Sequence, residues 1–252
     1  MFRAYSLFSK IKKCMGVYFD DPAKFVSEGR IHRAGAHARL TRIMNEVEKG
    51  LRFIETFDET RVVTFYGSAR ALPNDTWYHQ AYSLAKKLAS DDNPMAVCTG
   101  GGPGVMEAGN KGAYDAGGYS IGLGIELPHL SEAPNRYTTH RMNFYYFFAR
   151  KMVLVHIAQA HVFFPGGVGT MDEFFELTTL IATKKISNHP IIILVGVDFW
   201  KGLLGWMKDV VYRDYHAVSE DLFDKFIITD NMEEAYRLLD TVPARIEISD
   251  EI

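Results

Sequence analysis

The chain has 252 residues, of which 47% are hydrophobic and 23% are charged, and its 28 basic and 31 acidic side chains give a net charge of -3. This composition is typical of a folded chain and excludes an intrinsically disordered protein, and the charge excludes a generally basic nucleic-acid coat. No apolar run approaches the roughly 20 residues that span a bilayer, so we expect no membrane partner. Two cysteines, Cys14 and Cys98, are too few for a disulfide framework or a thiolate metal site and predict a cytoplasmic protein.

The first element predicted in chain order is an amphipathic helix over residues 36–57. Its apolar residues recur at spacings of three and four, with charged residues between them, which places one apolar stripe along a helix. The stripe consists of Leu40, Ile43, Met44, Val47, Leu51, Ile54 and Phe57. We expect this helix to pack on the main domain or on a partner chain.

After this helix, predicted strands and helices alternate to the end of the chain. Runs of β-branched and aromatic residues predict strands at residues 62–66, 95–98, 119–125, 161–164, 191–195 and 226–229. Helical spacing of apolar residues predicts helices at about residues 76–90, 104–116, 143–158, 170–185, 199–212 and 232–239.

This alternation determines the expected fold class. Strands that are apolar on both faces and separated by helices predict a mostly parallel sheet with helices on each side. We therefore expect an α/β fold, a Rossmann-like three-layer sandwich. Its parts are a helical N-terminal extension at residues 1–60, the α/β domain at residues 61–240 and a C-terminal tail at residues 241–252.

Two glycine-rich segments mark the expected ligand-binding edge of this sheet. Thirteen of the 21 glycines lie between Gly100 and Gly169, and both clusters follow predicted strands. Ligands of open parallel sheets bind beyond the carboxyl ends of the strands. Backbone N–H groups of a glycine turn, together with the positive end of the next helix, bind anions without a charged side chain. For residues 99–104 alone, a tight turn between strand and helix is the alternative.

The usual nucleotide-binding signatures are absent. The first strand is followed by Gly67-Ser68-Ala69-Arg70, which does not fit the G-x-G-x-x-G pattern of a hydride-transfer enzyme. The segment from Gly104 to Gly109 has the spacing of a P-loop but lacks the Lys-Ser or Lys-Thr that should follow. Both a dehydrogenase and an NTPase are thereby excluded.

The charges are unevenly distributed along the chain. The first 60 residues hold 11 basic and 8 acidic side chains, which leaves 17 basic and 23 acidic side chains for residues 61–252. Within that acidic remainder, the 39 residues from Ala133 to Met171 contain no Asp or Glu. The basic residues of this window are Arg136, Arg141, Arg150 and Lys151. A positive zone in an acidic domain favours an anionic small ligand, and chance spacing around a buried strand is the alternative.

Glu173 has two possible roles. It stands three residues after Thr170, at the start of a predicted helix, and Thr-x-x-Glu is the spacing of a capping box. On spacing alone, the capping role is favoured over a catalytic one.

Four motifs occur together in this chain: Gly67-Ser-Ala-Arg70, Thr99-Gly-Gly-Gly-Pro-Gly-Val-Met-Glu107, Phe148-Ala-Arg-Lys151 and Pro165-Gly-Gly-Val-Gly-Thr-Met-Asp-Glu173. In combination they resemble a known family, the LOG family, which is often labelled lysine-decarboxylase-like. The resemblance runs from about Arg61 to Leu239, and the extended N-terminal helix is similar to that of the longer bacterial branch. Members of the family are cytokinin-activating or general nucleoside 5′-monophosphate phosphoribohydrolases.

The resemblance implies that Arg150 and Glu173 are catalytic. It also implies a set of residues that bind the substrate and its phosphate, with Asp172 as a reserve carboxylate. This set is Gly67, Ser68, Arg70, Gly101, Gly102, Gly104, Met106, Asn110, Met142, Lys151, Gly166, Gly167, Gly169, Thr170 and Asp172. The residue types leave alternatives open. The methionines could belong to the core, Arg70 could cap a helix, and Arg150 could form a surface salt bridge. Phe148 and Ala149 replace a His-Glu pair found in many members, so the preferred base stays open.

The implied reaction is hydrolysis of the N-glycosidic bond of a nucleoside 5′-monophosphate to free base and ribose 5-phosphate. It passes through an oxocarbenium-like state, which needs a carboxylate to stabilise the sugar cation or activate water. Glu173 suits this role, and we expect the start of its helix to stabilise its ionised form. The same helix start would hold the phosphate through Gly167, Gly169 and Thr170.

A protein that binds a nucleotide or molybdenum cofactor without hydrolysing it is the alternative function, because related Rossmann-like carriers share the glycine architecture. No cofactor is implied, and the spacing of His140, His156 and His161 does not suit a zinc site. The expected partner is the nucleotide substrate, with no nucleic-acid polymer. By resemblance we expect a homodimer or a larger homo-oligomer.

Overall fold

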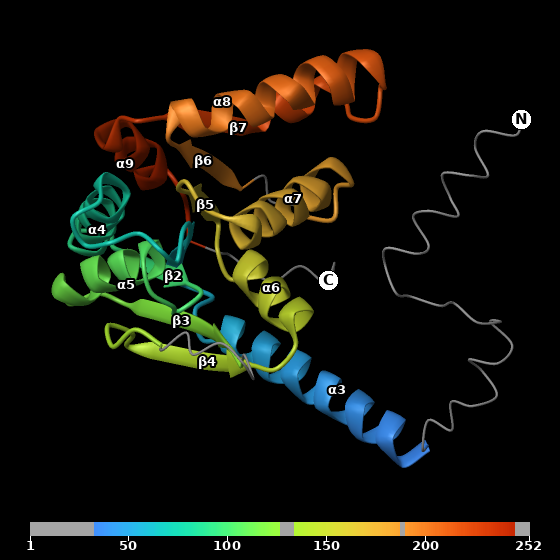
Figure 1. The fold of residues 1–252 in the computed structure, drawn as a ribbon. Helices are drawn as coiled ribbons and strands as arrows, with labels where there is room; N and C mark the ends of the chain where they lie inside the picture. Colours follow the sequence, from blue (N-terminus) through green and yellow to red (C-terminus); the bar gives the residue numbers. More distant parts are fainter. Residues whose placement is uncertain (1–32, 127–133, 187–189, 245–252) are drawn as a thin grey trace, which may run out of the picture. The chain divides into compact units, whose positions relative to one another are not determined.

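The computed structural model of the chain describes residues 33–126, 134–186 and 190–244 (Figure 1). Cys14 and most of the N-terminal extension lie outside these residues. The chain divides into two units, Met1–Met44 and Asn45–Ile252. In the first unit, the described residues are the beginning of helix α3 (Arg33–Glu55), and here the side chains of Leu40 and Met44 are exposed. Within the described ranges, no helix combines the length and apolar character needed to cross a membrane.

The second unit contains a seven-stranded sheet in the order β4-β3-β2-β1-β5-β6-β7, and every neighbouring pair is parallel. The strands are β1 (Arg61–Tyr66), β2 (Met95–Thr99), β3 (Ser120–Ile125), β4 (His140–Phe144), β5 (Ala160–Phe163), β6 (Ile191–Val195) and β7 (Phe226–Thr229). Strands after β1 are added on one side as far as β4, and β5 then pairs with the other side of β1. The order therefore reverses between β1 and β5, which is where open α/β sheets bind ligands.

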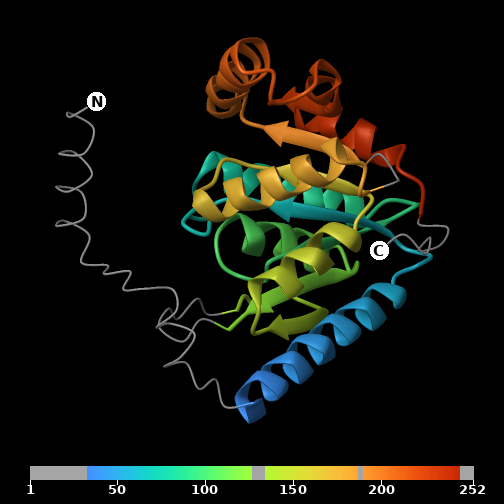
Figure 2. The same ribbon diagram turned by 90° about the vertical axis from the view of Figure 1, so that its right-hand side faces the viewer.

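Helices cover both faces of this sheet, as the α/β prediction requires. Helices α4 (Thr76–Ala89), α5 (Val105–Asp115) and α9 (Met232–Asp240) lie on one side, and α6 (Phe147–His156) and α7 (Val168–Ala182) lie on the other (Figures 1 and 2). Helix α8 (Val197–Trp206) continues as a π-helix at Met207–Asp214, and a 3-10 helix at Glu220–Lys225 precedes β7. The predicted α/β sandwich is confirmed.

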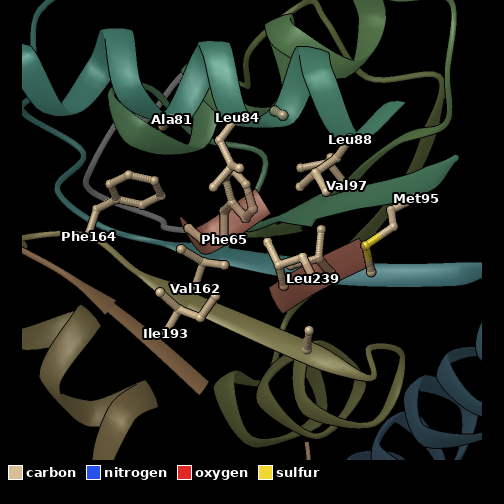
Figure 3. Packing of buried hydrophobic residues seen from close by; sticks show 14 of the residues in the cluster. Phe65, Ala81, Leu84, Leu88, Met95, Val97, Val162, Phe164, Ile193 and Leu239 are labelled. Atoms are coloured by element: carbon tan, nitrogen blue, oxygen red, sulfur yellow. The ribbon is translucent and has the colours of Figure 1, made fainter. Parts of the chain in front are cut away.

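The core follows the alternation of side chains along β1, whose residues are all buried. Val63 and Phe65 belong to the cluster that packs under α4, α5 and α9, which Figure 3 shows with Leu84 and Leu239. Val62 lies on the opposite face of the sheet, in a separate cluster with buried residues of α3 and α6. Burial on both faces is the reason why β1 reads as a continuous apolar run.

The prediction of a helix beginning at residue 143 is wrong, because residues 140–144 form the edge strand β4 and helix α6 begins at Phe147. At this break, the two carboxylate oxygens of Glu46 on α3 accept hydrogen bonds from the backbone N–H groups of Tyr145 and Tyr146, at 2.9 and 3.1 Å. These bonds satisfy the amides between strand and helix. Because Glu46 lies about a hundred residues earlier, no local pattern contains this information.

Arg61, the first residue of β1, attaches the last helix to the sheet. Its side chain is only 4% exposed. The guanidinium donates hydrogen bonds to the carbonyl oxygens of Leu239, Asp240 and Val242 at 2.8–2.9 Å, and to that of Asn93. The last carbonyls of a helix have no partners within it, so a buried cation at this place satisfies groups that would otherwise lack hydrogen bonds.

Candidate active site

The loops that follow β1, β2 and β5 are joined through one residue, Ser68. Its N–H donates to the carbonyl oxygen of Pro165 at 3.1 Å, and its own carbonyl accepts from the N–H of Val105, the first residue of α5, at 3.0 Å. Gly67 packs directly against Val105, since a Cβ at Gly67 would lie 2.7 Å from its side chain. Arg70 is exposed, and its N–H donates to the Ser68 hydroxyl at 3.1 Å. The structure therefore brings the three loops together, with Arg70 at their surface.

The loop after β2 requires glycine at two positions. Gly104 has φ +70° and ψ −130°, and a Cβ there would lie 2.2 Å from the carbonyl oxygen of Ser68. Gly101 has φ +71° and lies close to the backbone of Gly122 on β3. L-residues rarely adopt this backbone region, so both the conformation and the close approach select glycine. Gly102 belongs to the same turn and is buried.

Two buried asparagines, Asn135 and Asn110, support this loop through hydrogen bonds. Asn135 donates its N–H to the carbonyl of Gly101 at 2.9 Å and its side-chain amide to that of Gly102 at 3.0 Å. The same amide also donates to the side-chain oxygen of Asn110 at 2.9 Å. Asn110 is fully buried and donates in turn to the hydroxyl of Ser120 at 2.9 Å. Asn110, expected to bind substrate, is therefore a support of the loop.

Asn135 is a residue that the sequence analysis missed. It stands between Pro134 and Arg136, inside the acid-free window but outside both glycine-rich segments and all four motifs. Its contribution depends on contacts with a loop more than thirty residues earlier, so only the folded chain identifies it.

The second glycine loop leads into α7 and does not contain the capping box suggested by spacing. Helix α7 begins at Val168 with Gly167 as its N-cap residue, and no side chain caps it. Thr170 therefore lies in the first turn of the helix, where it is buried against Gly166; a Cβ at Gly166 would lie 2.2 Å from the Thr170 hydroxyl. This arrangement removes the capping alternative for Glu173.

Gly167 and Gly169 differ from the other glycines of the site. A Cβ at either position would have no atom within 4 Å, and neither residue has a positive φ. Neither packing nor backbone conformation therefore requires glycine at these two places. Both lie at the start of α7, where the first N–H groups have no partner within the helix and the helix dipole is positive.

Arg150 on α6 lies against the first glycine loop. It is 9% exposed, and its Nε donates to the carbonyl oxygen of Leu123 at 2.8 Å. A Cβ at Gly100 would lie 2.1 Å from the Arg150 Nη2 and 2.8 Å from the Sδ of Met106, so both side chains meet over this glycine. This position excludes the surface salt bridge as the role of Arg150. Met142, by contrast, packs with the core cluster beside α3 and α6.

Lys151 and Asp172, both expected to bind substrate, contact each other. The Nζ of Lys151 lies 3.0 Å from Oδ2 of Asp172 and 3.4 Å from Oε2 of Glu176, and only 17% of the Lys151 side chain is exposed. Burial lowers the pKa of Lys151, but its hydrogen bond to Asp172 and the charge of Glu176 outweigh burial and raise it. Glu176 was not predicted, although its spacing of four from Asp172 places both carboxylates on one helix face.

Glu173 has a pKa raised from 4.5 to about 7. Burial is the main cause, and the positive charge of Arg150 opposes it; the charges of Asp172 and Glu176 raise the pKa further, and that of Lys151 lowers it. The expectation that the helix start stabilises the ionised form is therefore wrong. Glu173 lies in the second turn of α7, beyond the reach of the helix dipole, and burial dominates.

Two buried aromatic groups on the neighbouring strands β1 and β5 contact each other, and one of them, Tyr66, interacts with Glu173. The hydroxyl of Tyr66, the last residue of β1, lies 3.2 Å from Nδ1 of His161. Burial raises the pKa of Tyr66, as does the charge of Glu173. Burial lowers the pKa of His161 to about 3, so its ring is neutral at pH 7. Among the residues that the structure describes, no group of three or more His, Cys, Asp or Glu side chains could hold a metal ion.

Similarity to proteins of known structure concerns the fold. A molybdenum cofactor binding protein from Rippkaea orientalis is 21% identical, with a TM-score of 0.52 over 72% of this chain and 96% of its own. The molybdenum cofactor carrier protein from Chlamydomonas reinhardtii is 18% identical, with a TM-score of 0.53 and the same coverage. At these identities the likeness shows a common fold.

Sequence comparison gives named relatives at low identity. A cytokinin riboside 5′-monophosphate phosphoribohydrolase of Mycobacterium tuberculosis is 25% identical over 143 residues, which are 56% of this chain and 74% of the relative. A pyrimidine/purine nucleotide 5′-monophosphate nucleosidase of Escherichia coli K12 is 27% identical over 200 residues, which are 72% of this chain and 43% of that protein. The family model described as "Possible lysine decarboxylase" matches residues 106–239. Since this match covers more than half of the chain, the protein belongs to this family, the LOG family.

Proposed function

We propose that the protein hydrolyses the N-glycosidic bond of nucleoside 5′-monophosphates, releasing the free base and ribose 5-phosphate. The observation that carries this proposal is a buried arginine, Arg150, whose charge acts on a carboxylate, Glu173, with a pKa of about 7. Membership of the LOG family and the names of two relatives support it. The substrate class includes AMP-like nucleotides and cytokinin riboside monophosphates.

Glu173 is suited to general acid and base chemistry because its pKa lies near neutral pH. In its ionised form, the carboxylate stabilises the developing cation on the ribose or removes a proton from the attacking water. The bond between the sugar carbon and the base nitrogen breaks, and its electron pair leaves with the base. Water supplies the hydroxyl group on the sugar, and the other proton of that water ends on the base. Arg150, fixed by its bond to Leu123, contributes positive charge that orients the anionic nucleotide.

The start of α7 is the proposed place of the 5′-phosphate. Gly167 and Gly169 leave open space where side chains would otherwise stand, and the adjoining amide groups and helix dipole favour an anion. A phosphate there would be held by backbone groups close to Glu173 in the chain. The space at these two glycines supports a ligand role because the fold itself does not need glycine there.

The decarboxylase description of the family is not the function we propose. A lysine that forms a Schiff base with a cofactor must be available as the neutral amine. Lys151 is held by Asp172 and Glu176, and its raised pKa keeps it protonated at neutral pH. Its surroundings thus oppose the chemistry that the description suggests.

The phosphate position leads to a prediction for Gly169→Ala. We expect the KM for AMP to rise about tenfold, a loss of roughly 1.4 kcal/mol of binding, because the added methyl group occupies space needed by the phosphate. The melting temperature should stay equal or rise slightly, since alanine favours a helix. Gly202→Ala on α8 is the matched control, because a Cβ there also meets nothing within 4 Å. An unchanged KM in Gly169→Ala would contradict the proposed phosphate position.

A panel of substrates tests the substrate class. The purified protein is incubated with nucleoside 5′-monophosphates, the corresponding nucleosides and the 5′-diphosphates, and free base is measured by chromatography. We expect release of base from monophosphates and at least about a hundredfold lower kcat/KM for nucleosides, because they lack the group that the helix start binds. Equal activity on nucleosides would contradict the proposed substrate class, and binding of monophosphates without any base release would favour a carrier.

A further inference from the structure

Lys151 follows Arg150 directly on α6, but the two cations contact different parts of the molecule. Arg150 reaches the carbonyl of Leu123 and the first glycine loop. The Lys151 ammonium lies instead 3.0 Å from Asp172 and 3.4 Å from Glu176, both on α7. Consecutive residues of a helix point about 100° apart, which allows one helix to serve both contacts.

The two carboxylates bound by Lys151 flank Glu173 in the sequence of α7. Asp172 precedes it directly, and Glu176 follows it by three residues, the spacing of neighbours on one helix face. Three carboxylates thus stand within five residues at a site where Glu173 is largely removed from water. Without a cation between them, Asp172 and Glu176 would repel each other, and nothing on α7 would offset their effect on Glu173.

We propose that Lys151 is a positioning residue for Glu173: it binds Asp172 and Glu176 together, fixes α7 against α6, and leaves Glu173 as the carboxylate that carries out the chemistry. This inference rests on the proposed hydrolysis and replaces the expectation that Lys151 binds the substrate. The ammonium is already shared between two carboxylates and only 17% of the side chain is exposed, so its contacts are internal to the protein.

The charges around Glu173 determine the sign of the expected effects. Arg150 and Lys151 on α6 lower its pKa, whereas Asp172 and Glu176 on α7 raise it together with burial. Tyr66 on β1, a neutral group whose pKa is itself raised, faces it from the sheet. Removing the charge of Lys151 takes away one stabilising cation and leaves two carboxylates uncompensated. Each of these changes disfavours ionisation of Glu173 and moves its titration to higher pH.

The test compares the pH dependence of AMP hydrolysis in Lys151→Met and Lys151→Arg. For Lys151→Met we expect the acid limb of the kcat–pH profile to shift to higher pH by about one unit, so that kcat at pH 7 falls about fivefold. KM should change less than about threefold. Lys151→Arg keeps the charge and should keep the acid limb of the wild type. A rise in KM without a shift of the acid limb would overturn the proposal, because that result belongs to a residue that binds phosphate.

A second variant, which keeps Lys151 in place, should shift the acid limb in the opposite direction. Glu176→Gln removes a charge that raises the pKa of Glu173, so the acid limb should move to lower pH. Combined with Lys151→Met, Glu176→Gln should return the limb toward that of the wild type. An upward shift in Glu176→Gln, or no rescue in the double variant, would contradict the positioning role.

Titration of the Glu173 carboxyl carbon by NMR separates this inference from the proposed function. The resonance is assigned by its loss in Glu173→Gln. If no nucleotide is hydrolysed, the proposed function fails, but the pKa of Glu173 should still rise in Lys151→Met and fall in Glu176→Gln. An unchanged pKa in both variants would overturn the positioning role whatever the activity.

Discussion

Glu173→Gln is expected to lose AMP hydrolysis by about 100- to 10,000-fold while the folded protein becomes more stable at pH 8. The expected loss of rate equals the usual contribution of general acid and base catalysis, because glutamine neither accepts the proton nor carries the charge. The gain in stability follows from the raised pKa of this half-buried carboxylate. A residue that serves only the fold would not combine these two effects.

The sign of the stability effect follows from proton linkage. The pKa of Glu173 is about 7 in the folded chain and ordinarily 4.5. Between these values the folded state holds a proton that the unfolded state has released, so stability falls as the pH rises through this window. The penalty is complete above pH 7 and amounts to at most about 3 kcal/mol. Glutamine is uncharged at every pH and removes the penalty.

Denaturant unfolding at pH 5 and pH 8 measures this effect, alongside kcat. Glu173→Gln should exceed the wild type in stability by up to about 3 kcal/mol at pH 8 and by less at pH 5. Glu55→Gln, the same change on an exposed side chain at the end of α3, should alter neither quantity. Equal stability differences at the two pH values would contradict the raised pKa, and retained hydrolysis would contradict the catalytic role.

Arg61→Met is expected to destabilise the protein by about 3–5 kcal/mol without changing the chemistry of the site. Methionine keeps much of the apolar length but leaves the carbonyl groups at the end of α9 without their buried donor. For a chain of this size the melting temperature should fall by about 10 °C. Thermal unfolding measures the effect, and kcat is measured well below the melting range.

The control for this prediction is Arg52→Met, which removes an exposed arginine whose Nη2 lies 2.9 Å from Glu48. A surface pair of this kind contributes less than about 0.5 kcal/mol, so the melting temperature should stay within about 2 °C. A similar fall in melting temperature in Arg61→Met and Arg52→Met would show that the buried contacts of Arg61 do not hold α9 in place. Loss of kcat in folded Arg61→Met would contradict the placement of the site at the carboxyl ends of the strands, because Arg61 begins β1.

Sequence patterns predicted the parts of the fold that depend on local residues. Strands such as residues 62–66 are buried on both faces, so they are apolar throughout and indicate a parallel sheet. The glycines at residues 101 and 104 mark turns with a positive φ, which L-residues rarely adopt. Strand β4 was missed, and the backbone N–H groups between it and α6 bond to Glu46, which lies on a helix far earlier in the chain.

The motifs of the candidate site were predictable from the sequence, but the separate roles of their residues were not. The resemblance assigns Arg150 and Glu173 to one site, but strand topology alone does not, because β4 before α6 and β5 before α7 are separated in the sheet by β3, β2 and β1. The pairing of Lys151 with Glu176, and the support that Asn135 gives to the glycine loop, depend on contacts between elements. Burial, which raises the pKa of Glu173, is likewise a property of the folded chain.

The most direct test of the proposed activity is to measure adenine and ribose 5-phosphate after incubating the wild-type protein with a large excess of AMP. Hydrolysis predicts that both products appear in equal amounts, exceed the amount of protein many times over, and form at least about a hundredfold more slowly with Glu173→Gln. Recovery of all AMP intact, with at most one molecule bound per protein chain, would contradict the proposed reaction.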